Sequence, residues 1–228
     1  MVSSVNQLLI VSTWSECQRS YDPYACVIYL WSEQRFSSSG REDVDVRMLG
    51  KGRPFVVEMD DPHRVELSAK DLMEIQKEIN KSADIKVRDL QIVDKKDVDK
   101  LKEGEIEKTK TYSALCGSKE SLSDEQLNKL QEVKDLVIYQ KTSIRVPHRR
   151  PLATRERIVY SMSMEKIDDL HFTLSLSTQA GTYIKEFVHG DFGRTTPNLG
   201  TLTGVECDIL ELDVQSVELD WPPSLEES

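Results

Sequence analysis

Short segments in which apolar and polar residues alternate recur along most of this chain. The clearest covers residues 171–177, where Phe172, Leu174 and Leu176 take every second position and polar residues fill the rest. Successive side chains of a β-strand point to opposite faces, so this alternation predicts a strand with one buried face. By the same reasoning we predict strands at residues 55–58, 87–93, 112–115, 157–160 and 207–217.

Two segments carry the signals of α-helices. Ser68 can cap a helix that runs to about Asn80, and Ser123 with Gln126 forms a capping-box pattern for a second helix. The apolar residues at helical spacing are Leu72, Ile75 and Ile79 after the first cap and Leu127, Leu130, Val133 and Val137 after the second. Turn-forming residues predict loops at residues 37–40, 50–54, 60–63, 94–104 and 190–200. Strands interleaved with few helices favour an α+β fold with a mixed, mainly antiparallel sheet and flanking helices.

The hydropathy pattern argues against a membrane protein. The chain has 228 residues, enough for one full domain or two small ones, and its longest apolar run, at residues 25–31, is far shorter than a membrane-spanning helix. No basic residue precedes the apolar residues 8–11, so the start does not resemble a secretory signal. We therefore expect an intracellular protein, in the nucleus or the cytoplasm, with no membrane partner.

The cysteines and histidines form no pattern of metal ligands. The four cysteines are scattered without a Cys-x-x-Cys pair, and His63, His171 and His189 do not cluster. We expect reduced cysteines that pack in the interior, and no metal site in this chain.

Charge is unevenly distributed along the chain. The net charge is −10, but residues 205–228 contain eight acidic residues and no basic one, while residues 141–157 carry a local charge of +5. An acidic protein is a poor partner for nucleic acid, because affinity rests largely on Lys and Arg that neutralise phosphates. The basic strip at residues 141–157 allows two interpretations, a solvated face or a surface that binds RNA.

Residues 36–55 concentrate groups that could perform chemistry. Gly40 permits a tight turn, and Arg41 and Arg47 flank two carboxylates, Asp43 and Asp45. A carboxylate held beside cations stays ionised and can act as a nucleophile. An acidic turn with surface ion pairs is the alternative, and physical reasoning alone does not choose between Asp43 and Asp45.

Three motifs in the expected order resemble those of the pseudouridine synthases. Gly40-Arg41-Glu42-Asp43 resembles their Gly-Arg-x-Asp catalytic motif, Lys110-Thr111-Tyr112 their strand motif with an aromatic ring, and residues 181–185 their Gly-Thr-Tyr-Ile-Arg/Lys motif. Longer sequence segments, at residues 148–152, 178–194 and 220–223, are similar to those of one family in particular. That family comprises the archaeal and eukaryotic tRNA pseudouridine synthases that act on uridines 54 and 55 of the TΨC loop.

The resemblance implies an isomerase that needs no metal and no organic cofactor. Such an enzyme breaks the N-glycosidic bond of a uridine, turns the base and rejoins it through carbon five. Asp43 would be its catalyst, as nucleophile or general base, and Lys185, on a short helix opened by Thr182, would keep that carboxylate ionised. A solvated helix lysine is the alternative role for Lys185.

The resemblance also implies contacts to the substrate. Tyr112 would stack on the flipped uridine, Tyr183 would line the pocket, and Arg41 would hold the nucleotide or a phosphate. Alternatively, Tyr112 fills the core, Tyr183 only packs against its neighbours, and Arg41 stabilises the turn. The residues of the basic strip expected to bind the RNA backbone are Arg145, His148, Arg149 and Arg150.

The resemblance covers residues 36–228, which we take as the catalytic core, and leaves residues 1–35 as an unmatched segment. Relatives carry a longer N-terminal RNA-binding part with paired cysteines, so we expect a pseudouridine synthase fold with a central cleft that is incomplete at its N-terminus. The expected partner is the TΨC arm of tRNA, bound weakly and in a salt-sensitive way by a monomer. A non-catalytic RNA-binding module, or an inactive fragment that retains the cleft, is the alternative function.

Overall fold

The chain folds into two compact units. The computed structural model describes residues 7–16, 34–40, 45–60, 66–96, 98–99, 101, 108–146, 151–219 and 221–225. The first unit comprises Met1–Lys108 and Gln215–Ser228, and the second comprises Thr109–Val214. This division does not coincide with the sequence boundary at residue 35, which stays a prediction.

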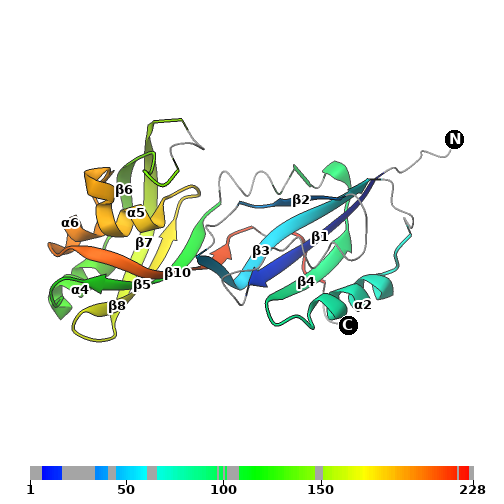
Figure 1. Ribbon diagram of the computed structural model, residues 1–228, viewed down its shortest axis with the longest axis horizontal. Helices are drawn as coiled ribbons and strands as arrows, with labels where there is room; N and C mark the ends of the chain where they lie inside the picture. Colours follow the sequence, from blue (N-terminus) through cyan, green and yellow to red (C-terminus); the bar gives the residue numbers. More distant parts are fainter. Residues whose placement is uncertain are drawn as a thin grey trace. The chain divides into compact units, whose positions relative to one another are not determined.

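An antiparallel sheet forms the first unit (Figure 1). Its central strand β1 (Gln7–Glu16) pairs with β3 (Val46–Asp60) on one side and with β4 (Ile85–Ile92) on the other, and β2 (Gln34–Ser38) adds to β3. Helix α2 (Ala69–Ile79) packs on this sheet through Leu72. The buried core that the helix shares with the strands contains Phe55, Val57, Met59, Leu72, Ile85, Val87 and Leu90.

The first predicted helix is confirmed, including its N-terminal cap. Ser68 Oγ accepts a hydrogen bond from the Asp71 N–H (3.2 Å), and the Ser68 N–H donates to Asp71 Oδ2 (2.8 Å). At the other end, the Asn80 side chain donates to the Val87 carbonyl (2.8 Å) and accepts from the Val87 N–H (2.7 Å). These bonds join the end of the helix to β4.

The loop predicted at residues 50–54 is wrong, because these residues lie inside the long strand β3. Glycine at position 50 serves a close approach of two backbones: its φ is +63°, and a Cβ there would lie 2.3 Å from the Gln215 carbonyl oxygen. The glycine is therefore required within the strand and does not end it.

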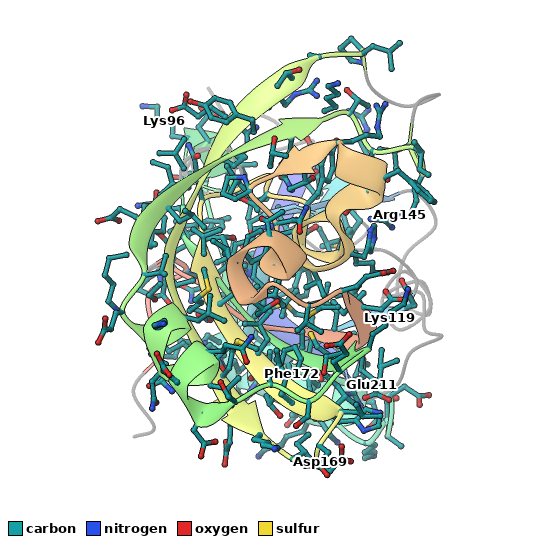
Figure 2. The ribbon with its side chains drawn as sticks, turned by 90° about the vertical axis from the view of Figure 1, so that its left-hand side faces the viewer. Lys96, Lys119, Arg145, Asp169, Phe172 and Glu211 are labelled. Carbon is teal, nitrogen blue, oxygen red and sulfur yellow. The ribbon has the colours of Figure 1, made fainter. Side chains whose placement is uncertain are left out.

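The second unit is built on a curled sheet with the strand order β10-β5-β8-β7-β6-β9. The strands are β5 (Lys110–Ser118), β6 (Lys134–Lys141), β7 (Thr154–Lys166), β8 (His171–Thr178), β9 (Thr195–Thr196) and β10 (Cys207–Val217). Neighbours from β5 to β9 are antiparallel, and Figure 2 shows the strands curving around α5 (Ile184–His189) and α6 (Leu199–Thr203). The predicted α+β class, with a mainly antiparallel sheet, is confirmed.

The second predicted helix begins where expected but is shorter. Helix α4 (Asp124–Gln131) starts with the capping box of Ser123 and Gln126 and ends at the cap residue Glu132. The predicted continuation through Val133 to Val137 is wrong, since Val137 belongs to β6 and pairs with Ile158 of β7. Helical spacing continued by chance into a segment rich in β-branched and aromatic residues, for which strand pairing is the better solution.

The helix that carries Lys185 begins at Ile184, with Tyr183 as its N-cap residue. The prediction that Thr182 opens this helix is wrong, because the Thr182 hydroxyl donates to the Gln179 carbonyl (2.7 Å) in the preceding turn. Helix α5 then ends in a turn, Gly190–Gly193, in which all four residues have positive φ.

Cys116 and Cys207 are free and buried, in agreement with the expectation of packing thiols. Burial raises the pKa of both thiols above its ordinary value. Cys17 and Cys26 lie outside the described residues. Within the described ranges, no helix is both long and apolar enough to cross a bilayer.

Gly190→Ala and Gly193→Ala form a matched pair that tests the turn after α5. Both glycines have φ near +80°, so alanine strains either position by about 1 kcal/mol. A Cβ at position 190 would also lie 2.6 Å from Asn198 Nδ2, whose side chain caps α6, whereas a Cβ at position 193 meets nothing within 4 Å. In urea unfolding we expect a loss of about 1 kcal/mol for Gly193→Ala and about 2–3 kcal/mol for Gly190→Ala. Equal losses would contradict the steric role of Asn198.

Candidate functional site

The structure describes four of the nine residues predicted to form the site. Tyr112, Arg145, Tyr183 and Lys185 are described and belong to the second unit. The predicted residues that lie outside the described ranges are Arg41, Asp43, His148, Arg149 and Arg150.

In the first unit, the described residues beside the Gly40-Arg41-Glu42-Asp43 segment form a tightly bonded turn. The Ser39 N–H donates to the Pro54 carbonyl (3.2 Å), and the Gly40 N–H donates to the Ser38 carbonyl (2.8 Å). The Ser38 hydroxyl in turn donates to the Gly40 carbonyl (2.7 Å). The backbone that leads into the predicted catalytic aspartate is therefore fixed on β3.

The buried side chain of Arg53 stabilises this turn by a hydrogen bond. Arg53 is only 1% exposed, and its guanidinium donates to the Ser39 carbonyl (3.3 Å) and approaches the Met48 sulfur (3.8 Å). Arg53 was not predicted from the sequence as a functional residue. The available sequence signal was its position directly before Pro54 and the apolar residues Phe55 to Val57. A cation that is buried with such a segment needs hydrogen-bond partners.

Tyr112 lies on the buried face of β5. Its side chain is 5% exposed, its backbone is opposite Leu176 of β8, and the same face carries Ala114 and Cys116. The structure therefore shows it packed within the unit, and the stacking role of Tyr112 stays a prediction.

The segment before Lys185 is held by one buried side chain, that of Gln140 on β6. Gln140 is 1% exposed; its Oε1 accepts from the Tyr183 N–H (2.9 Å) and its Nε2 donates to the Tyr183 carbonyl (2.9 Å). Both backbone groups of Tyr183 are satisfied as in a strand pair. The buried Tyr183 hydroxyl has no hydrogen-bond partner among the described residues.

Helix α5 is anchored on its apolar face. Ile184, Phe187 and Val188 are buried in the core of the second unit, while Lys185 is half-buried on the same short helix. The orientation of the lysine therefore follows from how the apolar residues of α5 pack.

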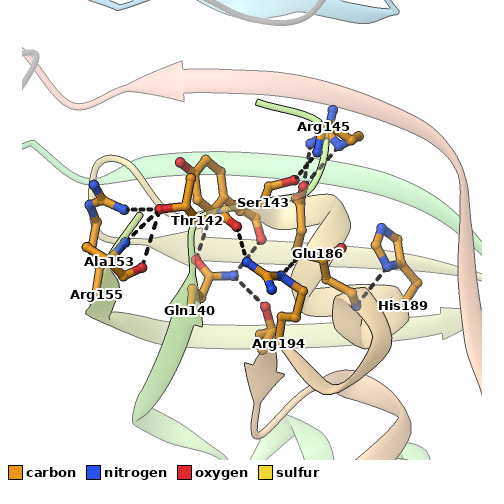
Figure 3. Close-up of polar contacts among 12 residues, drawn as sticks. Gln140, Thr142, Ser143, Arg145, Ala153, Arg155, Glu186, His189 and Arg194 are labelled. Atoms are coloured by element: carbon orange, nitrogen blue, oxygen red, sulfur yellow. Dashed lines mark hydrogen bonds and ion pairs between the residues drawn. The ribbon is translucent and has the colours of Figure 1, made fainter. Parts of the chain in front are cut away.

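Arg145 is engaged inside the protein (Figure 3). Its Nε (2.9 Å) and one terminal nitrogen (2.8 Å) both donate to Glu186 Oε1, and Glu186 is 1% exposed. Arg145, which was predicted to bind RNA, thus forms an ion pair with Glu186, the residue after Lys185. Glu186 was missed in the sequence, where its signal was one acidic residue among the buried residues Ile184, Phe187 and Val188.

Thr142 joins the two ends of the connection between β6 and β7 by hydrogen bonds (Figure 3). The Thr142 hydroxyl donates to the Pro151 carbonyl (2.8 Å) and accepts from the Ala153 N–H (3.0 Å) and from Arg155 (3.0 Å). The Thr142 carbonyl accepts a 2.6 Å bond from Arg194. The two ends of the segment that carries Arg149 and Arg150 are therefore fixed.

The described residues contain no group of three or more His, Cys, Asp or Glu side chains placed to hold a metal ion.

Comparison with known proteins identifies the family. The family model described as Pus10, C-terminal, matches residues 22–218. The tRNA pseudouridine synthase Pus10 of Mus musculus is 59% identical over 193 residues, which are 84% of this chain and 37% of the relative. The Pus10 of Methanocaldococcus jannaschii is 40% identical over 186 residues, which are 81% of this chain and 40% of that protein. The chain thus spans about two fifths of the length of these relatives.

Solved structures share the fold at low sequence identity. In the crystal structure of a Cbf5-Nop10-Gar1 complex, one chain matches with a TM-score of 0.53 and 15% identity, covering 90% of this chain and 47% of that one. This match supports the fold alone, whereas the sequence matches confirm the resemblance to tRNA pseudouridine synthases. The chain belongs to the Pus10 C-terminal family.

Proposed function

We propose that this chain isomerises uridine to pseudouridine in tRNA, at position 54 or 55 of the TΨC loop. The family and the three motifs, at Asp43, Tyr112 and Lys185, support this assignment. Because the chain spans about two fifths of its curated relatives, the activity of the whole relatives is carried over as part of this proposal.

Asp43 supplies the catalytic carboxylate. The reaction breaks the bond from N1 of the base to C1′ of the ribose and forms one from C5 to C1′, while C5 loses a proton and N1 gains one. The observation that carries the assignment is the rigid turn at Ser38, Ser39 and Gly40, supported by the buried Arg53. A catalytic group needs such a fixed base, because small displacements of a reacting atom cost large factors in rate.

The motif at residues 181–185 supports Lys185 as the basic residue that would keep the catalytic carboxylate ionised. Its position is fixed through the backbone bonds of Gln140 to Tyr183 and through the Arg145–Glu186 pair on the next residue. Tyr183, whose buried hydroxyl has no hydrogen-bond partner among the described residues, lines the substrate pocket, as the motif at residues 181–185 implies. Tyr112 supplies the ring on which that base stacks.

The first test compares Asp43→Asn with the neighbouring Asp45→Asn. We expect Asp43→Asn to lower the single-turnover rate of pseudouridine formation on an unmodified tRNA transcript by about a thousandfold or more, with tRNA affinity nearly unchanged. Asp45→Asn, which removes the same charge two residues away, should retain activity. The modified position is mapped by chemical labelling and primer extension.

Three outcomes of this test are informative. Activity that survives in Asp43→Asn would refute the catalytic assignment. Activity lost only in Asp45→Asn would move the catalyst to Asp45. If the unaltered chain is folded and binds tRNA but converts no uridine, it is the non-catalytic RNA-binding module considered above.

Glu186→Gln tests how Lys185 is positioned. The variant keeps the shape of the side chain but removes the charge that Arg145 pairs with, so we expect the unfolding free energy to fall by about 1–3 kcal/mol. The single-turnover rate should fall more than the tRNA affinity, because the helix that carries Lys185 shifts. The control Glu125→Gln breaks the exposed Glu125–Lys129 pair on α4 and should change neither quantity. A rate unchanged by Glu186→Gln would remove this pair from the positioning of Lys185.

Arg149→Ala combined with Arg150→Ala tests the RNA-binding strip. If both residues contact phosphates, the slope of log affinity against log salt should fall by about 2 in a filter-binding titration. The control, Lys134→Ala with Lys166→Ala, removes the same charge at the ends of β6 and β7 away from the connection 142–153. A slope that changes equally in both double variants would indicate general electrostatic attraction without phosphate contacts from this connection.

A further inference from the structure

The turn Gly190–Gly193 presents an unusual combination of backbone strain and exposure. The φ angles of its four residues are +80°, +47°, +55° and +79°, and the two central residues, Asp191 and Phe192, are not glycines. L-residues other than glycine rarely adopt this left-handed conformation, and a bulky residue there is an outlier. Such strain persists only where the surrounding structure enforces it.

Bonds on both sides enforce the conformation of this turn. Asp191 is 2% exposed, its N–H donates to His189 Nδ1 (3.0 Å), and its carbonyl accepts from the Arg194 N–H (3.1 Å). Its carboxylate also lies 3.4 Å from Arg194 Nε. The Asp191 side chain is thus a structural anchor, which accounts for one of the two strained residues.

Phe192 is not explained in the same way. Its side chain is 92% exposed, the highest value among the large hydrophobic side chains of the described residues. It gains nothing from packing, while glycine at this position would relieve the strain. An aromatic ring that a strained backbone keeps in solvent indicates a contact that the described residues do not make.

The surroundings of Phe192 indicate the chemistry of that contact. Arg194 bonds to the Thr142 carbonyl, and the Lys141 N–H donates to the Arg194 carbonyl (3.0 Å), so the turn is joined to the basic connection 142–153. The residues beside Phe192 are Asp191, which is buried, and Gly193. An exposed aromatic ring on a turn joined to this basic connection can bind an unpaired nucleotide by stacking, and the test below separates stacking from the docking of a protein on exposed apolar side chains.

We propose that Phe192 stacks on an unpaired base of the tRNA substrate and thereby positions the RNA on the second unit. This inference rests on the proposed function, because it takes tRNA as the ligand. The bonds of the turn fix the backbone at Phe192, so that little backbone freedom is lost on binding.

Phe192→Gly separates this role from folding. Because glycine adopts positive φ without strain, we expect the variant to unfold at a higher temperature than the unaltered chain. The same variant should bind unmodified tRNA transcript about tenfold more weakly, the loss expected from one base–aromatic stack. Phe192→Trp, which keeps a π-face, should retain affinity, while Phe192→Leu, which is apolar without a ring, should lose it. Fluorescence anisotropy with labelled transcript measures all of these affinities.

The matched control is Ile167→Ala in the β7–β8 turn. Ile167 is another exposed apolar residue of the second unit, and Figure 2 shows Asp169 of the same turn away from Arg145. The Ile167→Ala variant should bind tRNA with the same affinity as the unaltered chain.

Several results would overturn the inference. Unchanged affinity in Phe192→Gly, or full affinity in Phe192→Leu, would show that no stacking occurs, while the activity lost in Asp43→Asn would leave the proposed function intact. Self-association of the unaltered chain that is abolished in Phe192→Gly, with tRNA affinity unchanged, would assign the ring to a protein interface. A chain that binds no tRNA would overturn both proposals, whereas a chain that binds without converting uridine still decides the stacking question through affinity.

Discussion

The paired hydrogen bonds between the Gln140 side chain and the backbone of Tyr183 are the constraint on which the segment that carries Lys185 depends. A buried carboxamide is tolerated only when its donor and acceptor are both used, and here both are used on a single residue. The bonds fix the chain where it enters α5. The packing of Ile184, Phe187 and Val188 then sets the rotation of the helix, and Lys185 takes its place as a consequence.

Arginine performs structural work in both units. Arg53 holds the turn that precedes Asp43, Arg145 binds Glu186, and Arg155 and Arg194 both bond to Thr142 where the β6–β7 connection begins. The planar guanidinium carries five donors, so a single side chain can satisfy carbonyls and a carboxylate that no backbone pairing reaches. The positive strip in the sequence is therefore partly internal scaffolding, and residues 149–150 are the members that the proposal assigns to RNA.

Local signals predicted the beginnings of elements better than their ends. Both capping boxes, at Ser68 and Ser123, are found as expected, because a cap is a contact between residues three positions apart. The end of α4 and the strand through Gly50 were predicted wrongly. Each depends on a distant segment, namely the pairing of β6 with β7 and the close approach of Gln215 to Gly50.

By itself the sequence determined the α+β class, the family and the identity of the motif residues, because alternation, caps and contiguous motifs are encoded locally. The tertiary structure decided which polar groups support those motifs. Gln140, Glu186 and Arg53 stand 43, 41 and 14 residues from the partners they hold, and no spacing rule joins them. Such pairs become visible only when burial removes water and requires each polar group to find a partner within the fold.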